Sequence, residues 1–194
     1  MISAVVLAAG ASTRMGRPKL LLPLAGEPLV RRTTRQVCAA GFDEVLVVAG
    51  SDHEQVLAAL EGLPIRHALN EDYATGLGSS FRTAVAHLGD CEAAMFALAD
   101  QPFLTPDDYR RLLDTWRAER PAIVSVRYGD ITAPPHLFAR QLFPELAALR
   151  HGARPVLQRH REGTIVLSFP PDELFDIDTP EDYELAISRL SSAR

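Results

Sequence analysis

Ala4-Val-Val-Leu-Ala-Ala-Gly-Ala-Ser-Thr-Arg-Met-Gly-Arg-Pro-Lys19 is the stretch that decides the fold class of this chain. Residues 4–8 form a short, continuous, β-branched apolar run, which is typical of a strand buried on both faces. Residues 10–16 begin and end with glycine and hold small or polar residues between them, which is typical of a loop. The stretch therefore predicts a buried strand that ends in a glycine-punctuated loop.

The rest of the chain alternates strands and helices. Ser51 with Glu54 predicts a capping box at the start of one helix, and Thr105-Pro106 predicts the start of another. Further buried strands are expected at 44–49 and 93–99, and other strands at 65–69, 122–126 and 164–169. Helices are expected at 29–40, 51–61, 79–88, 105–117, 134–150, 155–161 and 179–190.

This alternation predicts an α/β fold with a mostly parallel, Rossmann-like sheet covered by helices on both faces, a three-layer sandwich. The 194 residues fit one domain, and no linker or repeat divides them, so we expect a single domain over residues 1–194. Ligands of such sheets bind outside the carboxyl ends of the strands. The functional residues are therefore expected in the loops at that edge.

Composition limits the classes of partner. Twenty Lys and Arg against twenty-five Asp and Glu give a net charge of −5, the wrong sign for a protein that mainly binds nucleic acid. Cys38 and Cys91 lie far apart, without a Cys-x-x-Cys or His/Cys cluster, which argues against a zinc site or a disulfide framework. No apolar run reaches the roughly 18 residues of a membrane span, and no signal peptide is indicated. We therefore expect a cytoplasmic protein with no membrane contact.

The loop after the first strand is suited to an anionic ligand. Its backbone N–H groups can line such a ligand while Arg14 and Lys19 supply positive charge. Lys19 is the only lysine among the twenty basic residues, which suggests a position where a compact ammonium serves and a guanidinium does not. The spacing of Gly10 and Gly16 matches neither a P-loop nor a dinucleotide-binding motif. The loop therefore predicts a triphosphate cradle.

At this point the sequence resembles a known family. Leu-Ala-Ala-Gly-x-Ser-x-Arg-Met-Gly-x-x-Lys, residues 7–19, is similar to the opening signature of the nucleotidyltransferases related to molybdenum cofactor cytidylyltransferase. Residues 22–29, 70–80, 100–102 and 176–182 resemble later segments of that family, so the resemblance spans nearly the whole chain. It implies the nucleotide-diphospho-sugar transferase type of fold. The opening signature is shared with sugar-phosphate and methylerythritol-phosphate nucleotidyltransferases, and is thus more specific for the reaction than for the acceptor.

The resemblance also implies roles for individual residues. Arg14, Lys19 and Asp100 are expected to be catalytic. The nucleotide is expected to contact Leu7, Ala8, Ala9, Gly10, Arg14, Lys19, Asn70, Gly78, Ser79 and Ser80. Ser79 and Ser80 follow two glycines at a predicted helix start, so they are equally well read as helix caps. None of the six histidines shows ligand spacing or a nucleophile partner, and none is assigned to catalysis.

Two acidic positions are expected to bind Mg²⁺. Asp100 follows a buried strand and Asp178 precedes the last predicted helix, so both can flank one cleft. Mg²⁺ takes one or two carboxylates and completes its octahedron with phosphate oxygens and water. Asp176 is an alternative to Asp178, and the sequence does not decide between them.

The predicted reaction is Mg²⁺-dependent transfer of CMP from CTP to the phosphate of molybdopterin or its metal-loaded form, with release of pyrophosphate. The alternatives are a guanylyltransferase, a sugar-phosphate or methylerythritol-phosphate cytidylyltransferase, and a regulatory or chaperone module that binds nucleotide without transferring it. Ala9 favours CTP, because guanylyl members of the family resemble Leu-Ala-Gly-Gly where this chain has Leu-Ala-Ala-Gly.

One segment departs from the family pattern. Relatives often carry Gly-Asp-x-Gly-Ala-Arg where this chain reads Leu149-Arg-His-Gly-Ala-Arg154. The missing Gly-Asp pair leaves the acceptor open, while Arg154 is expected to bind a phosphate or pterin. A transient contact with an enzyme that receives the finished cofactor is a further expectation.

Overall fold

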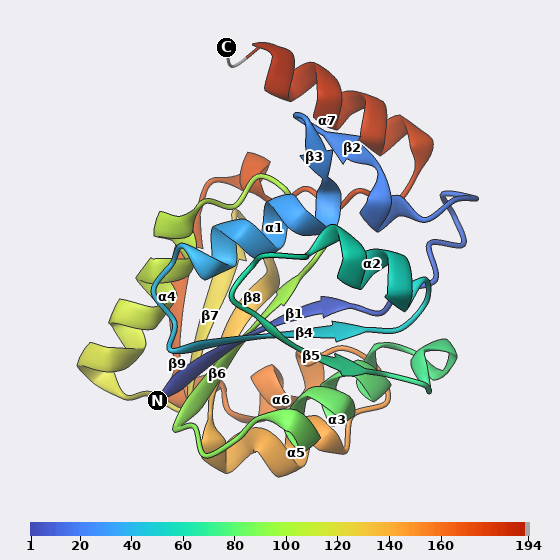
Figure 1. Ribbon diagram of the computed structural model, residues 1–194. Coiled ribbons are helices and arrows are strands. Elements are labelled where there is room, and N and C mark those ends of the chain that lie inside the picture. Colours follow the sequence, from blue (N-terminus) through green and yellow to red (C-terminus); the bar gives the residue numbers. More distant parts are fainter. Residues whose placement is uncertain (193–194) are drawn as a thin grey trace.

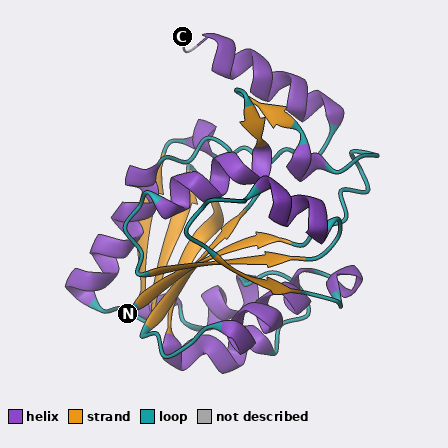
Figure 2. Cartoon of the chain, in the orientation of Figure 1, coloured by secondary structure: helices purple, strands orange, loops and turns teal. Residues whose placement is uncertain are grey.

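The computed structural model describes residues 1–192 as a seven-stranded sheet between two layers of helices (Figures 1 and 2). The strand order is β5-β4-β1-β6-β8-β7-β9, and a separate hairpin pairs β2 with β3. The strands are β1 (Ile2–Ala8), β2 (Pro23–Leu24), β3 (Glu27–Pro28), β4 (Glu44–Ala49), β5 (Arg66–Leu69), β6 (Ala93–Leu98), β7 (Ile123–Tyr128), β8 (Ile131–Ala139) and β9 (Thr164–Phe169). The α/β three-layer fold with a mostly parallel sheet is confirmed.

The helices form the outer layers. The α-helices are α1 (Leu29–Cys38), α2 (His53–Ala59), α3 (Leu77–His87), α4 (Pro106–Glu119), α5 (Phe143–Ala147), α6 (Arg154–Arg159) and α7 (Pro180–Ser192). Short 3-10 turns, η1 (Lys19–Leu21) and η2 (Tyr73–Thr75), follow β1 and β5. In Figure 1, α1, α2 and α4 lie over one face of the sheet, while α3, α5 and α6 lie over the other. None of the helices in residues 1–192 is long and apolar enough to cross a membrane.

Strand β1 occupies the centre of the parallel half of the sheet. It pairs in parallel with β4 on one side and with β6 on the other, and all seven of its residues are buried. Ala4, Val6 and Ala8 contribute to the core under α1, α2 and α4, while Val5 and Leu7 contribute to the core under α3, α5 and α6. A strand buried on both faces reads as a continuous apolar run, which is why the sequence revealed it.

One predicted helix was partly wrong. Residues 134–139 belong to strand β8, which runs antiparallel between β6 and β7. The helical part of the expected range 134–150 is a 3-10 turn, η3 (Arg140–Leu142), followed by α5. The prolines of this segment suggested a helix start, since proline fits the first helical turn. In the sheet, the pairing of β7 with β8 shifts its register between Val124 and Val126, next to the prolines, which have no N–H to donate. Phe138 of β8 is fully buried between β6 and β7.

The expected capping box of Ser51 was also wrong. Helix α2 begins at His53 after Asp52, which has a left-handed φ of 53° and makes no side-chain cap. Ser51 Oγ instead donates a hydrogen bond to Asp52 Oδ2 at 2.9 Å. The start of α4 is as predicted: Thr105 Oγ1 accepts from Asp108 N, and Asp108 Oδ2 accepts from Thr105 N. A capping motif in sequence thus works only where the backbone enters the helix from an extended conformation.

A small hairpin and the last helix complete the carboxyl edge. The turn between β2 and β3 holds Ala25 and Gly26, both with positive φ, as two-residue hairpin turns require. Tyr183 Oη in α7 donates to the carbonyl of Pro23 at 2.6 Å, which holds α7 against the hairpin.

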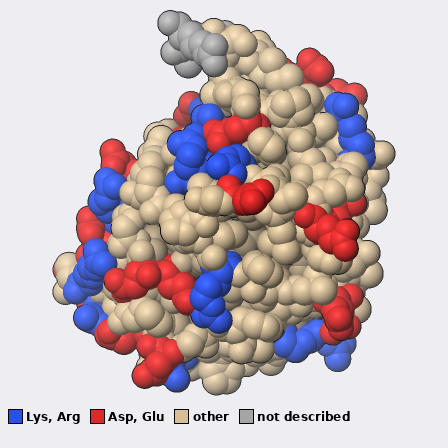
Figure 3. Space-filling model, in the orientation of Figure 1, with Lys and Arg blue, Asp and Glu red and all other residues tan. Residues whose placement is uncertain are grey.

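On the face shown in Figure 3, basic and acidic side chains are interspersed and do not gather into one basic patch.

Candidate active site

The centre of the site is a cluster of ion pairs, defined here as Arg14, Lys19, Asp100 and Asp178 and called the charged cluster. Lys19 Nζ donates to Asp100 Oδ2 at 2.5 Å and to Asp178 Oδ1 at 2.8 Å. Arg14 Nη2 donates to the other Asp178 oxygen, Oδ2, at 2.8 Å. The structure thus brings together four predicted site residues from three segments far apart in sequence.

Three members of the charged cluster, Lys19, Asp100 and Asp178, are positioned by backbone hydrogen bonds. Lys19 opens the turn η1, and its N–H donates to Ser12 Oγ at 3.2 Å. Asp100 follows β6 at the carboxyl edge, and its carbonyl accepts from Ile177 N at 3.2 Å, which joins the segment before α7 to the end of β6. Asp182 Oδ2 accepts from the N–H of Asp178 at 3.1 Å and thereby fixes the entry to α7.

Burial makes the ion pair of Lys19 with Asp100 stronger than a surface pair. The side chains of Lys19 and Asp100 are 11% and 17% exposed, whereas that of Arg14 is 70% exposed. Burial disfavours the Lys19 ammonium, but the charge and hydrogen bond of Asp100, followed by those of Asp178, outweigh it, so the pKa of Lys19 is raised above its ordinary value. Lys19 therefore carries its charge throughout the physiological range.

Asp176 lies beside the charged cluster but is not part of it. Its Oδ1 accepts from Gln101 Nε2 at 2.8 Å, and no Lys19 contact reaches it. Loss of hydration and the neighbouring Asp100 raise the pKa of the Asp176 carboxyl. Of the two alternatives left open by the sequence, Asp178 is the one that shares the Lys19 ammonium with Asp100.

The donor set fits a magnesium ion that is brought with phosphate. Asp100 Oδ1 is buried and has no hydrogen-bond partner, which is unusual for a carboxylate oxygen and points to a ligand. Within residues 1–192, no group of three His, Cys, Asp or Glu side chains could hold a metal by itself. Because Mg²⁺ needs only one or two carboxylates when phosphates supply the other ligands, Asp100 with Asp178 suits it.

A second group of site residues carries no charge: Asn70, Ser79 and Ser80, called here the neutral cluster. Asn70 Nδ2 donates to Ser79 Oγ at 2.8 Å and to Ser80 Oγ at 3.0 Å, and all three residues are buried. Ser79 Oγ also donates to the carbonyl of Gly76 at 2.7 Å. The Ser79 hydroxyl therefore already donates its hydrogen bond within the protein, whereas Ser80 lines the cavity described next.

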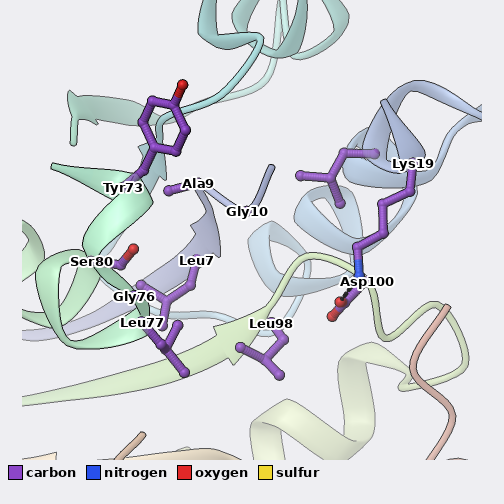
Figure 4. A pocket seen from close by; sticks show the side chains of 11 residues that line it. Leu7, Ala9, Gly10, Lys19, Tyr73, Gly76, Leu77, Ser80, Leu98 and Asp100 are labelled. Carbon is purple, nitrogen blue, oxygen red and sulfur yellow. Dashed lines mark hydrogen bonds and ion pairs between the residues drawn. The ribbon is translucent and has the colours of Figure 1, made fainter. Parts of the chain in front are cut away.

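A cavity of about 240 Å³ separates the two clusters (Figure 4). In Figure 4, Lys19 and Asp100 meet at one side of the cavity, Ser80 lies at the other, and Leu77 and Leu98 form its apolar floor. The full lining is Leu7, Ala9, Gly10, Lys19, Leu20, Tyr73, Gly76, Leu77, Ser80, Leu98 and Asp100. A polar ligand can thus reach both clusters at once.

Five predicted nucleotide contacts, and the predicted acceptor contact Arg154, do not line this cavity; the five are Ala8, Arg14, Asn70, Gly78 and Ser79. Ala8 packs into the core under α1. Gly78 permits a close approach: a Cβ there would lie 2.2 Å from the carbonyl oxygen of Leu149. Arg154 lines a separate cavity of about 360 Å³, together with Arg150 and His151. Leu77 lies beside both cavities, since a Cβ on Gly152 would be 3.8 Å from its Cδ2.

The sequence of residues 4–164 matches the family described as the MobA-like NTP transferase domain. The chain belongs to the MobA-like NTP transferase family. The match covers most of the chain and includes Lys19 and Asp100. As a member of this family, the chain is an enzyme of the nucleotidyltransferase type. The resemblance expected from the opening signature is therefore confirmed at the level of the family.

Two curated relatives illustrate the range of MobA-like proteins. The purine catabolism protein PucB of Bacillus subtilis is 34% identical over 200 residues, which cover 96% of each chain. Nicotine blue oxidoreductase of Paenarthrobacter nicotinovorans is 36% identical over 134 residues, which cover 69% of this chain. This MobA-like chain spans only 65% of that second relative.

A solved structure agrees with the fold over its whole length. Rv0371c of Mycobacterium tuberculosis superposes with a TM-score of 0.88 at 32% identity, covering 96% of this chain and 97% of that one. A complex of the same protein with manganese superposes with a TM-score of 0.78 at 31% identity, covering 96% and 98%. A divalent metal is thus found with a close structural relative of this MobA-like domain.

Sequence reasoning missed several residues of this MobA-like site, among them the cavity-lining Leu20 and Leu98. Tyr73 and Leu77 line the cavity and are more than a third exposed, and Gly50 lies so close to Ala9 that a Cβ would approach the Ala9 methyl to 2.8 Å. Gln101 orients Asp176. Tyr73 could have been found, because it lies only three residues after Asn70 at the predicted edge; Gly50 carried no such signal.

Proposed function

We propose that the chain transfers a cytidylyl group from CTP to the phosphate of an acceptor, with molybdopterin or its metal-loaded form as that acceptor. The acceptor oxygen forms a bond to the α-phosphorus, the bond between the α-phosphorus and the bridging oxygen to the β-phosphate breaks, and pyrophosphate leaves. The observation that carries the proposal is the charged cluster, in which one buried ammonium is shared by two carboxylates at the carboxyl edge of the sheet.

The chemistry needs positioning and charge more than a base. A phosphate monoester has a second pKa near 6, so the nucleophile is already an anion at neutral pH. The residues around the cavity agree with this, because its lining includes a lysine and an aspartate but no histidine. Lys19 and Arg14 would neutralise the phosphate oxygens as the pyrophosphate leaves.

Mg²⁺ is the proposed metal, and Asp100 with Asp178 would hold it. Held by these two carboxylates, the ion would supply positive charge that stabilises the phosphate oxygens. The buried, unpartnered Asp100 Oδ1 supports this assignment. Asp178 is preferred to Asp176, because the Lys19 ammonium that contacts Asp100 also contacts Asp178, whereas Asp176 Oδ1 accepts from Gln101 Nε2 instead.

The base is proposed to lie against Ala9 and Gly10 on one wall of the cavity. Ala9 packs closely against Gly50, so the backbone where β1 enters the loop has no room to move away from the cavity. The Ala9 methyl group then limits the space for the base, which favours the smaller pyrimidine. Ser80, held by Asn70, is the hydroxyl available on the opposite side. The proposed preference is therefore CTP over GTP.

The acceptor is proposed to approach from the second cavity. Arg150 and Arg154 line it, and both suit an acceptor that carries a phosphate.

We place this reaction in the cytoplasm, and the two free cysteines, Cys38 and Cys91, support this location. We also propose a transient contact with an enzyme that receives the product.

Pyrophosphate release tests the proposal. The full chain is incubated with Mg²⁺, either CTP or GTP, and a panel of molybdopterin, a sugar phosphate and methylerythritol phosphate. Release only with CTP and molybdopterin is the expected result. Release with GTP or with another acceptor would replace the substrate assignment, and CTP binding without release under every condition would leave a nucleotide-binding module instead of an enzyme.

A further inference from the structure

The Lys19 ammonium occupies the place between the two carboxylates that are proposed to hold the metal. Its Nζ lies 2.5 Å from Asp100 Oδ2 and 2.8 Å from Asp178 Oδ1. We propose that Lys19 keeps divalent cations off Asp100 and Asp178 until a nucleoside triphosphate arrives, so that metal and nucleotide bind together. This inference rests on the metal part of the proposed function.

The oxygens of the charged cluster leave little for a free cation. Asp178 Oδ2 accepts from Arg14, and Asp178 Oδ1 and Asp100 Oδ2 both accept from Lys19. Of the four carboxylate oxygens, Asp100 Oδ1 alone has no hydrogen-bond partner, so a cation added alone would find a single protein oxygen open to it. A Mg²⁺ ion lies about 2.1 Å from its oxygen ligands. To bind both aspartates it would have to enter the space between them that the ammonium fills.

The net charge of the charged cluster also disfavours binding of a free divalent cation. The charged cluster contains two carboxylates and two basic side chains and is therefore formally neutral. A divalent cation added alone would meet no net negative charge within the cluster itself and would face the Lys19 ammonium at close range in a poorly hydrated place. A metal–triphosphate complex carries net negative charge, so the same two basic side chains attract it.

Lys19 can leave the carboxylates only when it gains another partner. An ammonium has three donors, and two of them are used by Asp100 and Asp178. Lys19 also lines the cavity, so phosphate oxygens placed there lie within reach of its flexible four-carbon chain. A triphosphate therefore frees the carboxylates and adds its own oxygens to the metal. By linkage, the metal must strengthen nucleotide binding by the same factor.

The test measures Mn²⁺ binding by electron paramagnetic resonance and calorimetry on the full chain. Mn²⁺ is titrated alone and in the presence of saturating α,β-methylene-CTP, with the affinity of the analogue alone for Mn²⁺ subtracted. We expect the wild-type affinity to rise at least about tenfold with the nucleotide, within the usual range of coupling between sites. Equal affinity with and without the nucleotide would overturn the proposal, and this measurement requires no variant.

Two variants that each lose one positive charge show whether the low Mn²⁺ affinity without nucleotide depends on Lys19 in particular. Lys19→Met and Arg14→Met each remove one positive charge next to Asp178, but only Lys19 stands between the two carboxylates. Without nucleotide, Lys19→Met should bind Mn²⁺ at least about tenfold more tightly than wild type, and Arg14→Met less than about threefold more tightly. No gain in Lys19→Met, or an equal gain in both variants, contradicts the proposal.

Failure of this inference is distinguishable from failure of the proposed function. Pyrophosphate release by a chain that binds Mn²⁺ equally well with and without nucleotide would remove the role of Lys19 and keep the transferase. Coupled binding of Mn²⁺ and the CTP analogue by a chain that never releases pyrophosphate would keep the role of Lys19 and remove the transferase.

Discussion

The two halves of the sheet use their strand ends differently. In the parallel half, β5-β4-β1-β6, the strands β1, β5 and β6 lead into the segments that carry Lys19, Asn70 and Asp100. In the other half, β8-β7-β9, strand β8 runs antiparallel to both of its neighbours, β6 and β7, so its carboxyl end lies at the far edge. β7 and β9 run parallel to each other and in the same direction as β6, and the segment after β9 is the part of this half that brings Asp178 to the charged cluster.

Buried polar groups follow the same division. Lys19 and Asp100 are buried but border the cavity, and they interact as ions. In the second half, His136 of β8 lies fully inside the sheet with its Nδ1 3.1 Å from Ser125 Oγ of β7. Burial lowers the pKa of His136 to about 3, so its ring is neutral at neutral pH. We therefore expect changes in the first half to alter turnover, and changes in the second half to alter stability.

The largest expected effect is the loss of a metal ligand in the site half. Asp100→Ala and Asp178→Ala should each reduce kcat for pyrophosphate release at least about a hundredfold, because the triphosphate charge would no longer be neutralised. Asp176→Ala is the matched control and should stay within about threefold of wild type. Near-normal turnover in either of the first two variants, or a large loss in the third, would reassign the metal site.

Lys19→Arg comes next. A guanidinium is larger and planar, and it does not fit between oxygens 2.5 and 2.8 Å from one nitrogen, so turnover should fall about tenfold or more. Arg117→Lys, on the exposed face of α4, controls for exchange between the two basic residues. If Lys19→Arg retains full kcat/KM for CTP, the site requires only a positive charge, and the rarity of lysine in this chain has no functional meaning.

The pH dependence of stability probes the second half. An unfolded histidine takes up a proton near pH 6.5, while His136 in the folded chain does so only near pH 3, so the free energy of unfolding falls as the pH drops through this window. His136→Gln should lack this contribution, worth up to about 1.4 kcal/mol per pH unit, with kcat unchanged. Urea unfolding at pH 7, 6 and 5 measures the difference, with His87→Gln on exposed α3 as the control. Parallel pH profiles for wild type and His136→Gln would contradict this.

The smallest expected effect concerns base selection. Ala9→Gly removes a methyl group that partly packs against Gly50, so the preference for CTP over GTP should relax by about 1 kcal/mol, about fivefold, without loss of catalysis. The measurement is the ratio of kcat/KM for the two nucleotides with one acceptor. An unchanged ratio would move base recognition to the Ser80 side of the cavity.

The fold was predictable wherever the local signal and the tertiary environment agreed. β4 and β9 have the expected bounds, because short β-branched runs between turn residues have no competing interpretation. β8 was missed because its Pro134-Pro135 pair fits a helix start, and only the sheet neighbours β6 and β7 show that the segment must be extended. Local patterns cannot register such long-range pairing.

The site was predictable as a set of positions but not as a set of contacts. Loops at the carboxyl edge indicated Lys19, Asp100 and the serines, and the roles of these residues stay predictions. The sharing of Lys19 by Asp100 and Asp178 joins positions 81 and 159 residues apart, and no spacing rule reaches that far. Asp176 and Asp178 could not be distinguished, because Gln101, which holds Asp176, becomes its neighbour only in the folded chain.

The missing side chain of Gly78 has a consequence for anyone who redesigns acceptor choice. The first turn of α3 rests directly on the backbone of Leu149 and Arg150, since Gly78 N donates to the Arg150 carbonyl and a Cβ would collide with it. Residues 149–154, the segment that departs from the family pattern, thus pack directly against α3, the helix that carries Ser79 and Ser80. Grafting this loop from a relative would transmit any backbone difference to the nucleotide side, so acceptor and nucleotide specificity have to be engineered as one unit.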